Sequence, residues 1–266
     1  MTEAPTAMPN DKVALITGAA RGIGLATAKR FLHEGWRVAL LDIEQQLLDS
    51  ATSSLRCPDR TLALHCDVSD AAMVADALER ITRRFGRLDA LVNNAGVARF
   101  APIMETIETD WQRILDVNLT GPFLCTRAAV PLMREHGGAI VNITSISAVR
   151  ASTLRSAYGT SKAALAHLTK QLAVELASAG IRVNAVAPGP VETAMAKAVH
   201  TPEIRADYHD AIPLNRYGLE EELAEAIFFL SSERSSYITG QVLAVDGGFD
   251  AAGIGLPTLR GERRNA

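Results

Sequence analysis

Thr17-Gly18-Ala19-Ala20-Arg21-Gly22-Ile23-Gly24 joins a short apolar run, Val13–Ile16, to a helix-like stretch. Gly18 permits a tight turn, Gly22 lets the backbone approach a pyrophosphate, and Gly24 lets the helix pack close to a strand. The free N–H groups and positive dipole end of that helix would face phosphates. A plain strand–helix turn is the alternative. The position between the first strand and the first helix favours a dinucleotide site.

The same alternation of short apolar runs and helix-like stretches continues along the chain. The apolar runs are Val13–Ile16, Val38–Leu41, Leu62–Leu64, Ala90–Val92, Ala139–Ile143, Val183–Ala187 and Val242–Val245. The helix-like stretches lie at about 22–34, 44–55, 70–85, 107–135, 156–179 and 219–231. Because the runs do not alternate polar with apolar residues, they indicate strands covered on both faces. We therefore expect an α/β fold: one domain with a doubly wound, parallel, seven-stranded, Rossmann-like sheet and helices on both faces.

Composition narrows the function classes. The chain has 266 residues, 27 basic and 30 acidic, a net charge of −3, and 48% apolar residues. This content excludes a disordered polymer, and the charge balance disfavours nucleic-acid binding. The three cysteines lack C-x-x-C spacing, which disfavours a disulfide framework or a zinc site and fits a reducing cytosol. No apolar run is long enough to span a membrane. Together with the cysteine pattern, this leads us to expect a cytoplasmic protein that holds no metal.

Two acidic residues bear on the choice of nucleotide. Asp42 ends the second apolar run, where a carboxylate can accept hydrogen bonds from both ribose hydroxyls and repel a 2′-phosphate. This favours NAD over NADP, although the Arg21 guanidinium could meet a 2′-phosphate. The alternative for Asp42 is a solvated loop residue. Asp67 follows the third run and either bonds the adenine amino group or caps the helix near Asp70.

Tyr158 and Lys162 are four residues apart in a helix-like stretch, and this spacing puts both on one face. A nearby ammonium lowers the pKa of a tyrosine from its usual value of about 10, and such a tyrosine can move a proton to or from an alcohol oxygen. Ser145 follows the run Ala139–Ile143, at the strand end where active residues of parallel sheets lie. A core tyrosine beside a surface lysine is the alternative.

Asn118 lies in the helix-like stretch at 107–135, which should run beside the sheet. A buried asparagine needs hydrogen-bond partners. We expect a backbone carbonyl and a water that leads to Lys162.

Taken together, these motifs resemble the shorter form of the short-chain dehydrogenase/reductases over about residues 10 to 250. The matching motifs are Thr17–Gly24 (T-G-x-x-x-G-x-G), Asn93–Gly96 (N-N-A-G), Asn118, Ser145, Tyr158–Lys162 (Y-x-x-x-K), Pro188-Gly189 with Thr193, and Asp246-Gly247-Gly248. The resemblance implies that Tyr158 is the acid/base and that Lys162 lowers its pKa and holds the nicotinamide ribose. Ser145 would orient the substrate, and Asn118 would hold a proton-relay water.

The resemblance and the glycine turn together give a set of expected cofactor contacts. They are Gly18, Arg21, Gly22, Ile23, Gly24, Asp42, Asp67, Val68, Asn94, Ala95, Gly96, Tyr158, Lys162, Pro188, Gly189, Val191 and Thr193. Relatives commonly form tetramers through the helix that holds Tyr158 and through the last strand, so the resemblance implies a homotetramer. It implies no metal.

We expect a flexible arm at 1–10, a Rossmann-like catalytic domain at 11–250 and a tail at 251–266 that packs on a neighbour or stays mobile. Within the domain, residues 190–218 have weak periodicity and several breakers, which is typical of a loop that forms a substrate lid.

The substrate is less well specified than the cofactor. The candidate pocket residues flank the motifs: Val97, Arg99, Ile146, Ser147, Arg150, Arg155, Met195 and His209. Of these, we expect Ser147, Arg150, Arg155 and Met195 to contact the substrate. If the arginines face the site, the substrate is anionic; if they are solvated, neutral polyols, sugars or secondary alcohols are favoured.

The expected function is an NAD-dependent oxidoreductase that interconverts a secondary alcohol (polyol, sugar or hydroxy acid) and its ketone. Two alternatives are an NADPH-dependent 3-oxoacyl thioester reductase and a non-catalytic NAD-binding sensor.

Overall fold

A single parallel sheet of seven strands forms the centre of the computed structural model, which describes residues 11–253 apart from the side chains of residues 195 and 198. The strands are β1 (Val13–Thr17), β2 (Arg37–Asp42), β3 (Thr61–His65), β4 (Ala90–Asn93), β5 (Gly138–Ile143), β6 (Ile181–Pro188) and β7 (Val242–Val245). Their order is β3-β2-β1-β4-β5-β6-β7, and every neighbouring pair is parallel. The predicted fold class is therefore confirmed.

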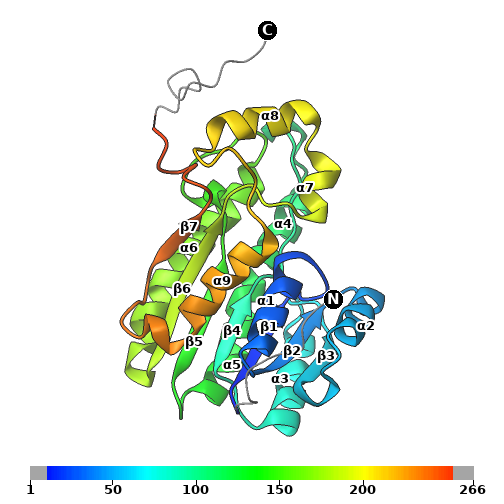
Figure 1. Ribbon diagram of the computed structural model, residues 1–266, viewed down its shortest axis with the longest axis vertical. Helices are drawn as coiled ribbons and strands as arrows, with labels where there is room; N and C mark the ends of the chain where they lie inside the picture. Colours follow the sequence, from blue (N-terminus) through cyan, green and yellow to red (C-terminus); the bar gives the residue numbers. More distant parts are fainter. Residues whose placement is uncertain (1–10, 254–266) are drawn as a thin grey trace.

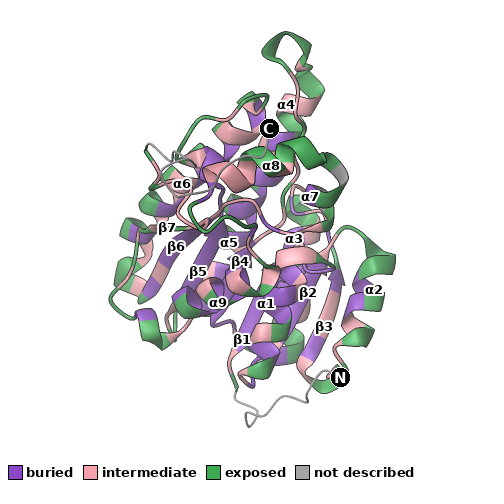
Figure 2. Cartoon of the chain, turned by 45° about the horizontal axis from the view of Figure 1, so that its top comes forward, coloured by how far each residue is buried: buried purple, intermediate pink, exposed green. Residues whose placement is uncertain are grey.

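Helices cover both faces of this sheet (Figure 1). They are α1 (Gly22–His33), α2 (Gln45–Ser54), α3 (Ala71–Phe85), α4 (Glu108–Leu115), α5 (Gly121–Met133), α6 (Ser156–Leu176), α7 (Ala194–Val199), α8 (Pro202–Ala211) and α9 (Glu220–Ser231). Alternate residues of β1 point to opposite faces of the sheet. Val13 and Leu15 belong to the cluster with α3, α5 and α6. Ala14 and Ile16 belong to the cluster with α1, α2 and α9. The five inner strands are consequently buried on both sides, whereas the edge strands β3 and β7 are partly exposed (Figure 2).

The helix expected at 107–135 is interrupted. Between α4 and α5, residues Asp116–Thr120 form a π-helical turn, in which each carbonyl bonds one residue further along than in an α-helix. The stretch expected at 156–179 is α6 followed by a 3₁₀ turn, Ala177–Ala179. It stops at Gly180, whose φ of +69° is left-handed, as a glycine C-cap should be.

Residues 190–218 are not the loop that weak periodicity suggested, because they contain α7 and α8. Thr193 caps α7 by accepting a hydrogen bond from the Ala196 N–H at 3.1 Å, and Thr201 caps α8 with Pro202 in its first turn. Both helices lie at the carboxyl end of the strands, at the top of Figure 1. This segment therefore stands above the edge of the sheet where the predicted site residues converge.

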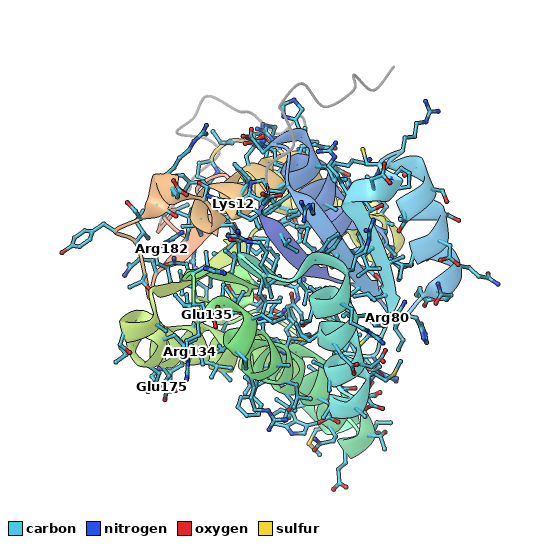
Figure 3. The ribbon with its side chains drawn as sticks, turned by 90° about the horizontal axis from the view of Figure 1, so that it is seen from below. Lys12, Arg80, Arg134, Glu135, Glu175 and Arg182 are labelled. Atoms are coloured by element: carbon cyan, nitrogen blue, oxygen red, sulfur yellow. The ribbon has the colours of Figure 1, made fainter. Side chains whose placement is uncertain are left out.

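At the opposite end of the sheet, Arg182 of β6 (labelled in Figure 3) holds the connection between α9 and β7. Arg182 on β6 donates to the carbonyls of Leu230, Ser232 and Ile238 at 2.8 to 3.3 Å. These bonds fix the connection between α9 and β7. Within residues 11–253, no helix combines the length and apolarity needed to cross a membrane, and no cluster of His, Cys, Asp and Glu is suited to a metal ion.

Candidate active site

The glycine turn after β1 packs so closely against neighbouring backbone that Gly18 and Gly24 leave no room for a Cβ atom. Gly18 and Gly22 both have a φ of +62°. A Cβ on Gly24 would lie 2.1 Å from the Gly18 carbonyl oxygen, and a Cβ on Gly18 would lie 2.9 Å from the Ala95 Cα. The chain therefore passes directly over the start of α1, as the sequence analysis predicted.

The N-terminus of α1 is open on its outer side. The nearest atom to a Cβ on Gly22 would be the Glu220 carboxylate at 3.7 Å, and the N-cap residue Arg21 makes no side-chain cap. The first N–H groups of α1 and the positive end of its dipole are thus placed to meet an anionic group. This arrangement fits the pyrophosphate of a dinucleotide.

Asn94 ties the glycine turn to β4. Its side-chain amide donates to the carbonyls of Thr17 and Gly18 at 2.9 and 3.0 Å. The Thr17 hydroxyl accepts from the N–H groups of Asn94 and Ala95, each at 3.0 Å. Asn94 therefore shapes the turn, which is a positioning role that the sequence pattern did not separate from direct cofactor contact.

Asp42 ends β2 beside the same turn. One carboxylate oxygen accepts from the Ala20 N–H at 2.9 Å and the other from the Glu44 N–H at 3.0 Å. The half-buried carboxylate is held over the glycine turn, unlike the solvated loop residue of the alternative interpretation. Each oxygen keeps a second lone pair for a ribose hydroxyl. Arg21 is exposed.

Asp67 is held by its own loop. One oxygen accepts from the Ser69 N–H and hydroxyl at 2.9 and 2.6 Å, and the other pairs with Arg113 at 3.1 Å. Burial raises the pKa of Asp67, but the hydrogen bonds from Ser69 and Arg113 outweigh it and the pKa is lowered. The alternative that Asp67 caps α3 is wrong, because Asp70 accepts from the first N–H groups of that helix. Val68 beside it is buried.

Tyr158 and Ser145 meet at the carboxyl edge of the sheet. Burial raises the pKa of Tyr158 above its ordinary value, while a hydrogen bond with Ser145 and the charge of Arg155 act to lower it. The Phe100 ring meets the Tyr158 ring edge-on, with centroids 6.3 Å apart. The phenol is therefore protonated at neutral pH and bonded to the serine predicted to assist it.

Lys162 is buried, with 4% of its surface exposed, and its ammonium donates to the Ile143 carbonyl at 2.8 Å. Burial lowers its pKa to about 8. The ammonium bonds the backbone and lies 5.9 Å from the centre of the Tyr158 ring, so the effect of Lys162 on the pKa of Tyr158 stays a prediction. A lysine with this pKa can hold or release a proton near neutral pH.

The π-helical turn brings Asn118 to the same place. Its side chain is fully buried, accepts from the Val97 N–H and donates to the Val97 carbonyl, both at 2.9 Å. The expected backbone carbonyl partner is thus confirmed. A Cβ on Gly96 would lie 3.3 Å from the Asn118 oxygen and 3.4 Å from the Lys162 nitrogen, so the two side chains converge on this glycine.

The loop after β6 carries the remaining predicted cofactor contacts. A Cβ on Gly189 would lie 2.7 Å from Asp246, so this glycine is required where Pro188 leads out of the strand. Val191 pairs with Gly218 in an isolated parallel bridge. Thr193 uses its hydroxyl to cap α7, so the loop and α7 are fixed together.

The predicted substrate residues separate into different roles. Arg150 donates to the Phe249 carbonyl at 2.8 Å and so ties down the chain after β7. Arg155 donates from both terminal nitrogens to the Tyr208 hydroxyl on α8, each at 3.2 Å. Ser147 shares a hydrogen bond with Ser152 at 3.2 Å, and the side chain of Met195 lies outside the described part of the chain.

Two residues near Tyr158, Phe100 and Tyr208, were not predicted from the sequence. Phe100 follows the Asn93–Gly96 motif closely, and Tyr208 is an aromatic residue in the expected lid. These sequence positions are the features that could have pointed to them. The partners that make them useful, Tyr158 and Arg155, are distant in sequence.

Comparison with known proteins agrees with this geometry. The family described as Enoyl-(Acyl carrier protein) reductase matches residues 18–250. A 3-oxoacyl-[acyl-carrier-protein] reductase from Thermotoga maritima is 42% identical over 240 residues, covering 89% of this chain and 97% of the relative. A cis-4-hydroxycyclohexanecarboxylate dehydrogenase from Sinomonas cyclohexanicum is 40% identical over 243 residues, covering 91% and 97%. The crystal structure of a levodione reductase superimposes with a TM-score of 0.88 at 34% identity, covering 92% of this chain and 99% of that one.

The glycine turn, the group formed by Ser145, Tyr158 and Lys162, and the extent of these similarities lead to one assignment. The chain belongs to the short-chain dehydrogenase/reductase family, whose members are oxidoreductases that act on CH–OH groups with a nicotinamide dinucleotide.

Proposed function

We propose that this chain is an NAD-dependent oxidoreductase that interconverts a secondary alcohol and its ketone, with Tyr158 as the acid/base. Polyols, sugars and hydroxy acids are the candidate substrates. The observation that carries the proposal is the hydrogen bond between Tyr158 and Ser145, beside a buried lysine and an open helix N-terminus. A protein that only bound NAD would not need a tyrosine hydroxyl that is bonded to a serine and lies beside a buried lysine.

The residues of the chain divide the chemistry as follows. When bound, the nicotinamide supplies or accepts the hydride. In the reductive direction, the neutral Tyr158 hydroxyl donates its proton to the carbonyl oxygen, and Ser145 donates a hydrogen bond to the same oxygen. Ser145 and the charge of Arg155 then stabilise the phenolate that remains. In oxidation the same groups work in reverse.

Lys162 is the proposed source of the next proton. With a pKa of about 8, its ammonium can give up a proton near neutral pH and regain it from solvent. Asn118, fixed to Val97 and next to Lys162 across Gly96, would hold a water on this route. The lysine would also bond the nicotinamide ribose.

The choice of NAD rests on Asp42. Its carboxylate stands beside the glycine turn with lone pairs left for the ribose hydroxyls, and it would repel a 2′-phosphate. A further candidate is an NADPH-dependent 3-oxoacyl thioester reductase, favoured by the 42% identity with a relative of that name. The cyclic hydroxycarboxylate in another relative's name favours the alcohol proposal instead.

Titration with NADH and NADPH, followed by nicotinamide fluorescence, tests this choice. We expect tighter binding of NADH. Asp42→Asn should weaken NADH binding by about tenfold, because a charged hydrogen-bond acceptor is lost, and should strengthen NADPH binding. Glu44→Gln, two residues away, serves as the control. Tighter binding of NADPH to the wild type would overturn the NAD assignment and bring the thioester reductase forward.

We further propose that the enzyme is a cytoplasmic homotetramer, acts on a small molecule without nucleic-acid or membrane partners, and closes residues 190–218 over its substrate. The edge strand β7 and helix α6 support the assembly, since Leu243 and Val174 expose apolar side chains there. The three unpaired cysteines Cys57, Cys66 and Cys125 suit a reducing compartment. Light scattering after size exclusion tests the assembly, and a monomer would contradict it.

A further inference from the structure

The arginines beside the active site differ in their partners and in their burial: Arg99 and Arg150 are exposed, whereas Arg155 is half-buried. Arg99 pairs with the Asp110 carboxylate at 3.0 Å. Arg150 is occupied by the Phe249 carbonyl at 2.8 Å. Arg155 has no carboxylate within 4.0 Å among the residues that the structure describes, and its bonded partner there is the neutral hydroxyl of Tyr208.

Arg155 is also the one of these three that is placed against the acid/base. It is the N-cap residue of α6, three residues before Tyr158. Its guanidinium carbon lies 4.7 Å from the centre of the Phe100 ring, which in turn meets Tyr158 edge-on. Phe100 and the Tyr208 hydroxyl thus fix the direction of the guanidinium.

The charges around Arg155 leave the region positive. Arg205 on α8 is paired with Glu192. His200 is predominantly neutral at pH 7, because burial and the charges of Arg155 and Arg205 lower its pKa. A half-buried guanidinium without a counter-ion is unfavourable in a folded protein. An anion at this position would relieve that cost.

We propose that Arg155 and the Tyr208 hydroxyl bind an anionic group, a carboxylate or a sulfonate, on the substrate whose alcohol carbon reacts at Tyr158. The planar fork of a guanidinium matches such oxygens, and Tyr208 accepts from Arg155 while its own proton stays free to donate. Because Tyr208 belongs to α8, the anion also joins α8 to the start of α6. The inference deepens the proposed function and depends on it for the substrate's reacting carbon.

Binding of a charged probe and its uncharged counterpart tests the inference without turnover. The probes are propane-1-sulfonate and propyl methyl sulfone, titrated by ligand-observed NMR into the protein with whichever reduced nicotinamide cofactor it binds. We expect the wild type to prefer the sulfonate, and Arg155→Gln to weaken sulfonate binding by about tenfold or more. Arg134→Gln, an exposed arginine at the far end of the molecule (Figure 3), should change nothing.

A structural role for Arg155, holding α8 through Tyr208, predicts a different pattern. Tyr208→Phe removes the same hydrogen bonds as Arg155→Gln but keeps the charge. We expect Tyr208→Phe to lose clearly less sulfonate affinity than Arg155→Gln, because one neutral hydrogen bond is lost while the charge remains, and Arg155→Lys to retain part of it. Equal loss in Tyr208→Phe and Arg155→Gln, or equal affinity of the wild type for both probes, overturns the anion site.

Turnover gives a second test that separates this inference from the proposed function. With 3-hydroxybutanoate and its amide as substrates, Arg155→Gln should lower kcat/KM for the acid about tenfold more than for the amide. An equal fall for both overturns the anion site while the oxidoreductase proposal stands. Absence of turnover with every alcohol and both cofactors overturns the proposed function, and the NMR titration still decides the role of Arg155.

Discussion

The proposed cofactor side of the site (residues 17–24, Asp42 and 93–96) and its proposed substrate side (Phe100, Arg155, 194–218 and Phe249) are built by different means. Hydrogen bonds between side chains and the backbone, together with close glycine packing, hold the cofactor side, directly above the two large apolar clusters of the sheet. On the substrate side, the buried apolar cluster among the described residues consists of Ala196, Ile212 and Tyr217. Side-chain contacts provide the rest of its support.

Ring and ion contacts supply that support. His200 stacks on Tyr208 with centroids 5.2 Å apart and shares a hydrogen bond with the Tyr217 hydroxyl at 2.9 Å. Arg205 pairs with Glu192 and lies over the Tyr217 ring. A backbone-built region tolerates few substitutions, whereas contacts between side chains can be exchanged. The proposed cofactor site is thus fixed by the fold, and the proposed substrate site by residues that can vary without disturbing the fold.

The largest expected effect lies where the two sides meet. Tyr158→Phe removes the proton donor but keeps the ring and its contact with Phe100. We expect turnover to fall by about a thousandfold, as for loss of a general acid, with the cofactor dissociation constant changed less than about twofold. Steady-state kinetics and fluorescence titration measure the two quantities. Turnover within tenfold of the wild type would sink the assigned role of Tyr158.

A matched pair of glycine substitutions compares the two sides directly. Gly24→Ala puts a methyl group 2.1 Å from the Gly18 carbonyl, whereas Gly218→Ala, at the end of the 190–218 segment, puts one at an ordinary contact distance of 3.6 Å from the Glu222 carboxylate. We expect Gly24→Ala to lower the free energy of unfolding by about 3 kcal/mol and to abolish cofactor binding, and Gly218→Ala to change it by less than about 1 kcal/mol. Urea denaturation measures both, and similar losses would contradict the comparison.

The substrate side should also open independently. Ile212→Ala removes a buried side chain, 1% exposed, from its small cluster. We expect local stability there to fall by about 2 kcal/mol. The midpoint of global unfolding should hardly move, because such a unit opens on its own. Hydrogen exchange should accelerate in α7 and α8 but not in α1, and KM should rise without a change in cofactor affinity. Equal acceleration in α1 would show that the two sides unfold together.

The smallest expected effect concerns the free energy of unfolding, through the cost of burying the charge of Lys162. Its pKa is about 8 in the folded chain against 10.5 ordinarily, so below pH 8 the buried charge costs up to about 3 kcal/mol. Lys162→Met removes this cost and one hydrogen bond to Ile143, with a net gain of about 1 to 2 kcal/mol at pH 7.

The pH dependence gives the check on that substitution. Between pH 8 and 10.5 the unfolded chain holds the lysine proton longer than the folded one, so the wild type gains stability as the pH rises. The advantage of Lys162→Met in urea denaturation should therefore shrink from pH 7 to pH 9.5. A gap that stays constant or widens would contradict the buried charge. Activity is expected to be lost in this variant.

The same contrast explains what the sequence could predict. Each inner strand contains a continuous apolar run, since both faces of the sheet are covered there, and the glycine turn is determined by local backbone conformation. These features are local and were predicted correctly. Residues 190–218 were expected as a loop because their helices begin at threonine caps, Thr193 and Thr201, and have little apolar periodicity.

The roles of the arginines could not be predicted, because their partners are distant in the chain. Arg150 meets Phe249, 99 residues on, and Arg155 meets Tyr208, 53 residues on. The lowered pKa of Lys162 likewise arises from burial, which no spacing motif reports. Motif spacing brought Tyr158 and Lys162 to one helix face but could not show that the ammonium bonds Ile143.

The π-helical turn at Asp116–Thr120 has a consequence for engineering the protein. It amounts to one surplus residue in an otherwise regular helix from α4 to α5. Deleting one residue would restore the ordinary repeat and turn Asn118 about 100° away from Val97, because each residue of an α-helix advances by that angle. A redesign that rewards helical regularity would favour this deletion, and its product would lack the amide beside Lys162 that the present turn provides.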